Sequence, residues 1–188
     1  MRVIAGIAKR IPLITPPGLS TRPTTDRIKE TLFNMLQGEL CDCSFLDLFS
    51  GSGAIGIEAL SRGAADCVFA EKDKKALECI RENLKKTGLE SKAQVVPGDI
   101  ISVLTQLEGK RKFDIVFMDP PYRQDYEKKV LAYLKNSRLI TEDSLIIFEA
   151  SLETTIEDIE ELGFTVEKRK EYKTNQHIFV RRSQKCLA

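Results

Sequence analysis

FLDLFSGSGAIG, residues 45–56, is the stretch that decides the fold of this 188-residue chain. It predicts an apolar strand, a glycine-rich loop and the beginning of a helix. Glycines allow a sharp backbone turn and let a ligand approach with no Cβ in the way. Glu71 follows Gly51 by 20 residues, at the end of the next apolar run, where a carboxylate can bind both ribose hydroxyls of an adenosine. The stretch therefore predicts a cofactor that contains adenosine.

From residue 44 onward, apolar runs typical of strands alternate with amphipathic segments typical of helices. We predict strands at 44–49, 67–71, 93–97, 113–118 and 144–149, and helices at 54–62, 73–87, 99–108, 125–136 and 152–162. Such alternation forms βαβ units, and hence a parallel sheet with helices on both faces. Two final strands, 164–172 and 177–182, predict an antiparallel hairpin. The fold class is α/β, with a mostly parallel seven-stranded sheet that ends antiparallel, as in class I (Rossmann-like) methyltransferases.

The residues before this pattern predict an extension of a different kind. Residues 2–6 and 11–15 are short strand-like runs that predict an N-terminal β-hairpin, and a helix follows from about Asp26. No stretch is linker-like or repeated. We therefore predict one domain over residues 1–188, with the hairpin extension at 1–21 and a catalytic core at 22–188.

The composition is that of an ordinary globular protein, with 42% hydrophobic and 30% charged residues. No apolar run is long enough for a membrane span or a signal peptide, so we expect a cytoplasmic protein. The five cysteines have no metal-ligand spacing, and the only histidine, His177, lies far from Cys41 and Cys43. We therefore expect reduced thiols and no metal.

The net charge of +1 hides an uneven distribution of charge along the chain. Residues 1–30 carry +4, residues 167–188 carry +5 and residues 31–166 carry −8. Basic ends around an acidic middle are typical of a contact surface for a polyanion. Solvated ends without a partner explain the charge equally well.

Two aspartates bear on which cofactor binds. Asp47 ends the first strand just before the glycine loop, where a carboxylate favours the sulfonium and ammonium of S-adenosylmethionine over an anionic pyrophosphate. Asp99 follows the third strand and can accept a hydrogen bond from the adenine amino group, although a plain helix N-cap explains it as well. The glycine pattern alone also matches the NAD fingerprint.

Asp119-Pro120-Pro121-Tyr122 follows the fourth predicted strand, at the edge where parallel sheets bind ligands. Two prolines fix φ and remove two N–H donors, which leaves a rigid array of acceptors. The Asp119 carboxylate and the Pro120 carbonyl could each accept one hydrogen bond from a base amino group. The lone pair of the amino nitrogen would then point at the sulfonium methyl group of S-adenosylmethionine. Tyr122 would stack on the extruded base. A simple turn at the end of a strand is the alternative.

Four segments make the chain resemble the RsmD family along nearly its whole length. They are residues 22–34 (RPTTDRIKETLFN), 47–53 (DLFSGSG), 58–64 (EALSRGA) and 119–122 (DPPY). The resemblance implies a guanine-N2 methyltransferase of 16S ribosomal RNA that uses S-adenosylmethionine. It further implies methylation of the guanine conventionally numbered 966 in an assembled or nearly assembled small subunit, and we expect a monomer.

The resemblance also implies roles for individual residues. The catalytic residues would be Asp119, Pro120, Pro121 and Tyr122. The cofactor would be held by Thr25, Asp47, Ser50, Gly51, Ser52, Gly53, Glu71, Lys72, Asp99 and Ile100. The RNA would be bound by Arg2, Lys9, Arg10, Arg22 and Arg27. The first hairpin departs from the family, because Lys9-Arg10-Ile11-Pro12 stands where a glycine-arginine pair and a further basic residue are usual.

Three other functions are compatible with parts of the sequence. A DNA adenine-N6 methyltransferase uses the same tetrapeptide but usually needs additional sequence to recognise its target. An NAD-linked oxidoreductase needs a hydride-transfer site, for which the chain offers no convincing candidate. A non-catalytic RNA-binding module would keep the fold without the chemistry.

Overall fold

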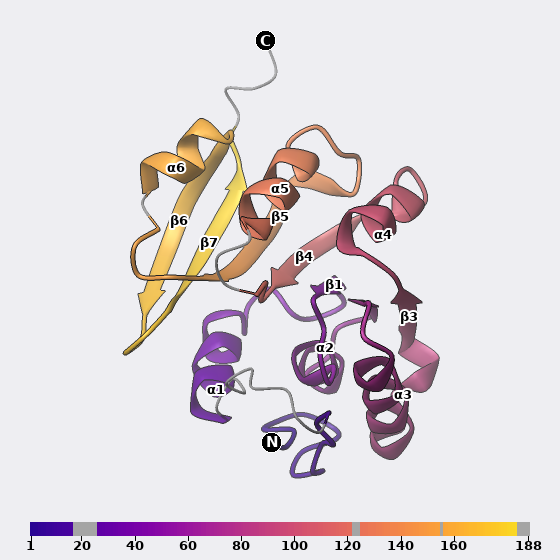
Figure 1. Cartoon of the computed structure of the whole chain (residues 1–188). Helices are drawn as coiled ribbons and strands as arrows, with labels where there is room; N and C mark the ends of the chain where they lie inside the picture. The colour runs from indigo at the N-terminus through magenta and orange to yellow at the C-terminus, as the bar shows by residue number, and fades with distance from the viewer. Residues whose placement is uncertain (17–25, 122–124, 155, 184–188) are drawn as a thin grey trace. The chain divides into compact units, whose positions relative to one another are not determined.

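The computed structural model describes residues 1–16, 26–121, 125–154 and 156–183, with no side-chain description for 156 and 157. The chain forms two compact units, Met1–Ile100 and Ile101–Ala188. Figure 1 labels most of the helices and strands of the two units.

The first unit is a three-stranded parallel sheet with helices. Its elements are α1 (Asp26–Met35), β1 (Ser44–Leu48), α2 (Ala54–Ser61), β2 (Asp66–Glu71), α3 (Lys74–Thr87), the 3-10 turn η1 (Glu90–Lys92) and β3 (Ala93–Pro97). β2 lies between β1 and β3, and the registers pair Leu48 with Ala70 and Glu71 with Pro97. The carboxyl ends of all three strands therefore meet at one edge of the sheet.

The core of this unit is built from β1, β2 and α2. Phe45, Leu46 and Leu48 of β1 are fully buried. Every residue of α2 is buried as well, which agrees with its apolar sequence. Gly56 allows this close packing, because a Cβ there would lie 2.4 Å from Cε1 of Phe69. Packing thus places the beginning of α2 directly against β2.

The N-terminal arm, residues 1–13, folds back on itself without forming regular strands. The expected hairpin is present in a short form, with one antiparallel bridge between Arg2 and Pro12 flanked by hydrogen bonds from the Val3 N–H to the Ile11 carbonyl and from the Leu13 N–H to the Met1 carbonyl, so the predicted strands 2–6 and 11–15 are too long. Proline has no N–H to donate to a ladder. The N–H groups of Ile4 and Ala5 donate to the side chain of Glu58 instead of a neighbouring strand.

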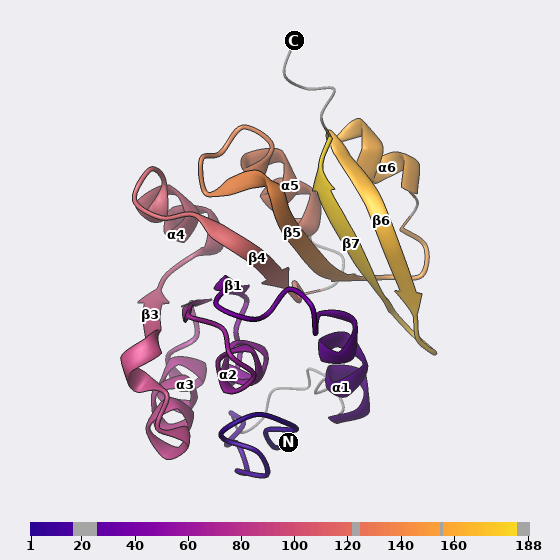
Figure 2. The same cartoon turned by 180° about the vertical axis from the view of Figure 1, so that it is seen from behind.

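The second unit contains a four-stranded mixed sheet. Its elements are α4 (Ile100–Leu107, which begins at the last residue of the first unit), β4 (Phe113–Met118), α5 (Tyr126–Leu134), β5 (Ile140–Ala150), α6 (Ile156–Glu161), β6 (Phe164–Glu171) and β7 (Gln176–Arg182). β4 and β5 are parallel, and β7 pairs antiparallel with both β5 and β6. Figure 2 shows β4, β5, β7 and β6 in this order.

The element types agree with those predicted from residue 44 onward, including the antiparallel end. The seven predicted strands of the α/β core are present, three in the first unit and four in the second. The main differences are that β5 begins at Ile140 rather than 144 and that α6 begins at Ile156 rather than 152. No helix in the described part of the chain is long and apolar enough to cross a membrane. The prediction of a single domain stays a prediction.

Candidate functional site

The glycine loop leads from the carboxyl end of β1 to the beginning of α2 and is hydrogen-bonded to the carboxyl end of β2. Gly51 and Gly53 have φ angles of +55° and +76°, in the left-handed region that favours glycine. Ser50 fixes the loop, because its hydroxyl donates to the Asp47 carbonyl at 2.6 Å and its N–H donates to the Ala70 carbonyl at 3.1 Å. The loop is therefore held in one shape by its own backbone and by β2.

The glycines of the loop meet different surroundings. A Cβ on Gly51 would meet no atom within 4 Å, so open space faces this residue. A Cβ on Gly53 would lie 3.3–3.4 Å from the side chains of Ile80, Ile57 and Phe69, so Gly53 faces the core. Gly51 is thus the position where a ligand can approach the backbone.

Glu71 reaches from the end of β2 to the glycine loop. Its carboxylate accepts hydrogen bonds from the N–H of Gly51 at 2.8 Å and from the N–H groups of Lys72 and Asp73 at 2.8 and 2.9 Å. The Glu71 carbonyl also accepts from the Gly98 N–H at 2.9 Å, which ties the end of β3 to the end of β2. The carboxylate is therefore oriented beside the open face of Gly51.

Asp47 is buried, with 1% of its surface exposed. Its carboxylate accepts the backbone N–H of Gly56 at 3.0 Å, in the first turn of α2. The positive end of a helix dipole stabilises a carboxylate in that position. Asp47 thus binds the backbone of α2 and also places a negative charge beside the glycine loop.

The remaining cofactor candidates lie around the same edge of the first unit. Lys72 and Asp99 are exposed, at the ends of β2 and β3 respectively, and Ile100 is buried where α4 begins. The first unit thus brings together Asp47, Ser50, Gly51, Ser52, Gly53, Glu71, Lys72, Asp99 and Ile100 at the carboxyl ends of its strands. Thr25 lies outside the described residues.

The catalytic candidates lie in the second unit, directly after β4. Asp119 is partly buried, Pro120 is buried and Pro121 is exposed. Tyr122, like Arg22 among the RNA candidates, lies outside the described residues. The carboxyl end of β4 therefore presents a carboxylate followed by two prolines, as the sequence predicts.

Glu149 is a second acid at this edge. Met118 and Phe148 are partners in the parallel register of β4 and β5, and Asp119 and Glu149 are the next residues along the two strands. Neighbouring strands lie about 4.8 Å apart, so the two carboxyl groups are neighbours. Glu149 is buried, with 8% of its surface exposed.

His177 and Tyr172 extend this group away from Asp119. His177 of β7 is opposite Glu149 in the antiparallel register, and its Nε2 lies 3.7 Å from Glu149 Oε2. Its Nδ1 lies 3.1 Å from the Tyr172 hydroxyl. The ring of Phe117 packs edge-on against the imidazole at a centroid distance of 5.9 Å. The second unit thus holds a row of polar side chains from Asp119 to Tyr172.

Burial, and then the nearby charge of Glu149, shifts two pKa values in this part of the second unit. Burial, and then the charge of Glu149, raises the pKa of Asp119 to about 7. Burial and the same charge raise the pKa of Tyr172 to about 12. A carboxyl group that titrates near neutrality at the end of a parallel strand is typical of a catalytic site.

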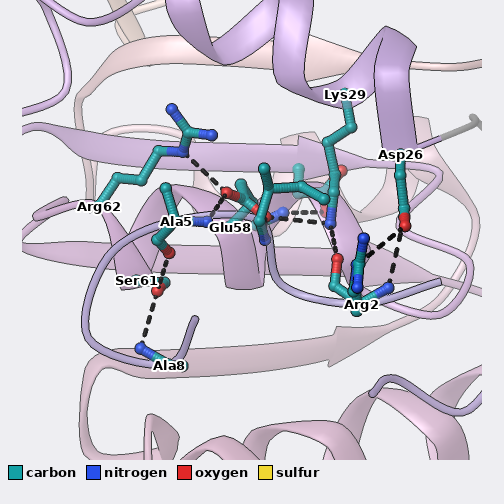
Figure 3. Close-up of polar contacts among 11 residues, drawn as sticks. Arg2, Ala5, Ala8, Asp26, Lys29, Glu58, Ser61 and Arg62 are labelled. Carbon is teal, nitrogen blue, oxygen red and sulfur yellow. Dashed lines mark hydrogen bonds and ion pairs between the residues drawn. The ribbon is translucent and has the colours of Figure 1, made fainter. Parts of the chain in front are cut away.

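The N-terminal arm, which carries three RNA candidates, is held by buried charges shown in Figure 3. The Glu58 carboxylate lies 3.0 Å from Lys29 Nζ and 2.8 Å from Arg62 Nε, and none of it is exposed. It also accepts the N–H groups of Ile4 and Ala5 at 2.8 and 3.0 Å. We call Lys29, Glu58 and Arg62 the Glu58 cluster; it connects the arm to both α1 and α2.

The basic candidates themselves are exposed. Lys9 and Arg10 lie in the turn of the arm, Arg27 lies on α1, and Arg2 forms a long ion pair of 3.4 Å with Asp26. Close contact with α2 fixes the turn, since a Cβ on Gly6 would lie 1.7 Å from the Ser61 carbonyl oxygen. The arm therefore presents its positive charges on a rigid support.

Sequence reasoning missed the Glu58 cluster and the Glu149–His177–Tyr172 row. A charged Glu58 inside an apolar helix, four residues before Arg62, was an available signal for a buried ion pair. Glu149 ends a predicted strand just as Asp119 follows one, but only the register shows that the two are neighbours. His177 has no local motif that could have pointed to it.

Comparisons with known proteins indicate one family along most of the chain. The family model described as "Conserved hypothetical protein 95" matches residues 1–181. YlbH of Bacillus subtilis is 41% identical over 173 residues, which are 91% of this chain and 92% of YlbH. The "Ribosomal RNA small subunit methyltransferase D" of Escherichia coli is 37% identical over 155 residues, which are 81% of this chain and 76% of that protein.

A solved structure supports the same conclusion. The Escherichia coli protein yhhF superposes with a TM-score of 0.83 at 33% identity, over 97% of this chain and 98% of yhhF. This similarity confirms the predicted α/β fold class over nearly the whole chain. The chain belongs to the family described as "Conserved hypothetical protein 95", which is the RsmD family that its sequence motifs indicate.

Proposed function

We propose that the chain transfers a methyl group from S-adenosylmethionine to the exocyclic N2 amino group of a guanine in 16S ribosomal RNA of the small subunit. The observation that carries the proposal is the carboxyl end of β4, where Asp119 stands before two prolines and beside Glu149. The relatives named for small-subunit ribosomal RNA methylation support the RNA as substrate. The proposed place of action is the cytoplasm, where ribosomal subunits are assembled.

The first unit offers groups that suit S-adenosylmethionine. Gly51 faces open space, so a ligand can approach its backbone without meeting a side chain. Glu71 has its carboxylate oriented there by three backbone N–H groups, and a carboxylate has further lone pairs for ribose hydroxyls. Asp47 adds a buried negative charge that favours a cationic ligand over a pyrophosphate. When bound, the cofactor supplies an electrophilic methyl group on a sulfonium.

The second unit offers the groups that prepare the base nitrogen. A base amino group is a poor nucleophile because its lone pair is delocalised into the ring. As a carboxylate, Asp119 accepts one N–H of this group, and the Pro120 carbonyl accepts the other. The two hydrogen bonds turn the lone pair away from the ring and stabilise the positive charge that grows on nitrogen.

Asp119 also suits the proton that the nitrogen must lose. The new C–N bond would form as the methyl–sulfur bond of the donor breaks and leaves a neutral thioether. The nitrogen then carries a positive charge, and one of its N–H bonds breaks to restore neutrality. A carboxylate whose conjugate acid has a pKa of about 7 accepts such a proton readily near neutral pH. Glu149 contributes to this pKa through its charge, which makes it a positioning residue and not a group that touches the base.

The proposal is tested by giving the purified chain S-adenosylmethionine and small subunits from cells that lack the endogenous methylation. We expect one N2-methylguanosine per subunit, identified by mass spectrometry of digested RNA. Asp119→Asn should lower kcat strongly while the variant still binds S-adenosylmethionine in calorimetry. Asp114→Asn, an exposed position on the same strand, is the matched control.

Three outcomes would contradict parts of the proposal. Methylation of DNA but not of ribosomal RNA would contradict the proposed substrate and leave the proposed chemistry in place. Binding of NADH without binding of S-adenosylmethionine would favour an oxidoreductase. Undiminished methylation by Asp119→Asn would remove the role of Asp119.

A further inference from the structure

The second unit contains a basic hollow at the edge of the sheet opposite to Asp119. The volume of this depression is about 270 Å³. We give the name basic hollow to the depression and its lining residues, which are Gly109, Lys110, Arg111, Lys112 and Arg138. None of these residues belongs to a motif discussed above. Four positive charges and no negative charge therefore face one small depression.

Backbone pairing builds the hollow from two connections. The segment 108–112 leads from α4 into β4, and the segment 135–139 leads from α5 into β5. The Phe113 N–H donates to the Leu139 carbonyl at 2.8 Å, so the two segments run side by side where the parallel strands begin. The four cations are thus brought together by the register of β4 and β5, whose adjacency Figure 2 shows.

Glu108 fixes the backbone at this corner of the sheet. Its carboxylate accepts the Ser137 hydroxyl at 2.5 Å and the Arg138 backbone N–H at 2.8 Å. Burial alone would raise the pKa of Glu108, but these hydrogen bonds, one from Tyr133 and the charge of Arg138 together lower it below the usual value. Glu108 is therefore an anion that fixes the backbone of Arg138 and does not line the hollow.

Two of the cations in the hollow, Lys110 and Lys112, are exposed. Within the described residues, the ammonium groups of Lys110 and Lys112 have no carboxylate partner within ion-pair distance. Arg111 is held against Phe113, with its guanidinium carbon 5.6 Å from the ring centroid. Like charges held close together repel one another, and an anion between them relieves this repulsion.

We propose that the basic hollow binds backbone phosphates of the RNA substrate. Arginine and lysine together are the usual ligands of phosphodiesters. The lining has no aromatic side chain on which a base could stack, and its volume is below that of most small-molecule sites, so a free nucleotide fits it less well. The contact is therefore independent of sequence and adds affinity without choosing the base.

The position of the hollow determines which RNA can reach it. Six residues of β4 separate it from Asp119, which at about 3.3 Å per residue is about 20 Å. An RNA strand bound at Asp119 therefore meets the hollow only if the substrate is long or folded. This inference rests on the proposed function, because it places the target base at Asp119.

The test compares two triple variants of the full chain that lose the same charge. Lys110→Gln, Lys112→Gln and Arg138→Gln remove three of the four positive charges of the hollow, and Arg81→Gln, Lys85→Gln and Lys86→Gln remove three from exposed positions on α3 as a control. Binding of small subunits is measured against salt concentration, independently of methylation. Each lost phosphate contact should reduce the slope of log K against log salt by about 0.7–0.9.

We expect the hollow variant to bind subunits about tenfold more weakly at physiological salt. Its KM for subunits should rise, its kcat should stay unchanged, and a short hairpin around the target guanine should be methylated at the wild-type rate. An equal loss in the control variant, or no loss in the hollow variant, would overturn the inference. So would inorganic phosphate binding to the hollow with subunit binding unchanged, which would indicate a free-phosphate site. The wild-type chain could fail to methylate subunits while the hollow variant still binds them more weakly than the control variant does. That result would contradict the proposed function and leave the inference about the hollow in place.

Discussion

Replacing Glu58 by glutamine should destabilise the chain more than any single change at its surface. The side chain is fully buried and receives four partners: two cations and the N–H groups of Ile4 and Ala5. Glutamine keeps the shape and one acceptor oxygen, but it removes the negative charge. Breaking a buried ion pair in this way costs about 3–5 kcal/mol. A domain of this kind has a free energy of unfolding of about 5–15 kcal/mol, so the loss is readily measured.

The size of the loss should depend on pH through Lys29. Burial lowers the pKa of Lys29 below 10.5, and Glu58 opposes this effect. Without Glu58, the pKa of Lys29 falls further, so the folded variant loses a proton that the unfolded chain keeps. Between the folded pKa and 10.5, the free energy of unfolding therefore rises with pH. Neutralising Lys29 costs at most about 5 kcal/mol at pH 7 and about 2 kcal/mol at pH 9, at about 1.4 kcal/mol per pH unit.

Urea unfolding followed by circular dichroism at pH 7 and pH 9 measures both effects. Glu90→Gln, an exposed position in η1, is the control and should change the free energy of unfolding by less than about 0.5 kcal/mol. Adding Lys29→Met to the Glu58→Gln chain should recover part of the stability and abolish the pH dependence. A deficit below about 1 kcal/mol, or one that is equal at both pH values, would refute the reasoning.

Three further predictions concern the candidate site. Gly51→Ala should weaken S-adenosylmethionine binding at least about tenfold in calorimetry and cost about 1–2 kcal/mol of stability because of its left-handed φ; Gly56→Ala should lower the free energy of unfolding by about 1–3 kcal/mol because its Cβ meets Phe69. Asp119→Asn should be more stable than the wild type at pH 8 but not at pH 4 in thermal unfolding, because a carboxyl with a raised pKa destabilises the fold as pH rises from 3.8 through about 7. The kcat/KM of the wild type should rise with pH around 7, and Glu149→Gln should move this rise to lower pH; an unmoved profile would contradict the coupling of the two acids.

The parts of the fold that the sequence predicted correctly are those set by local chemistry. The glycine loop needs positive φ angles at Gly51 and Gly53, and only glycine adopts these readily. Asp119 follows an apolar run whose bounds agree with β4. The beginning of β5 was missed because its residues 141–143 are polar and exposed, so they lack the alternation that marks a strand.

The parts that could not be predicted depend on contacts between distant residues. The pairing in the N-terminal arm stops earlier than expected, because the N–H groups of Ile4 and Ala5 bind a carboxylate more than fifty residues away. Nothing in residues 2–6 indicates this partner. The basic hollow depends in the same way on the register of β4 and β5, which brings Arg138 beside Arg111 and Lys112.

The neighbourhood of Asp119 shows how such a contact changes a functional conclusion. From the tetrapeptide alone, an ordinary aspartate would be ionised well below neutral pH, and the chain would be expected to work equally well in mildly acidic solution. The parallel register places Glu149 beside Asp119, and burial together with this charge raises the pKa of Asp119 to about 7. The motif therefore specifies what accepts the amino hydrogens, and the neighbouring strand sets the pH at which it can do so. Because the two acids come from strands separated in the sequence by α5, a substitution on β5 should alter the pH dependence of a reaction whose motif it leaves untouched.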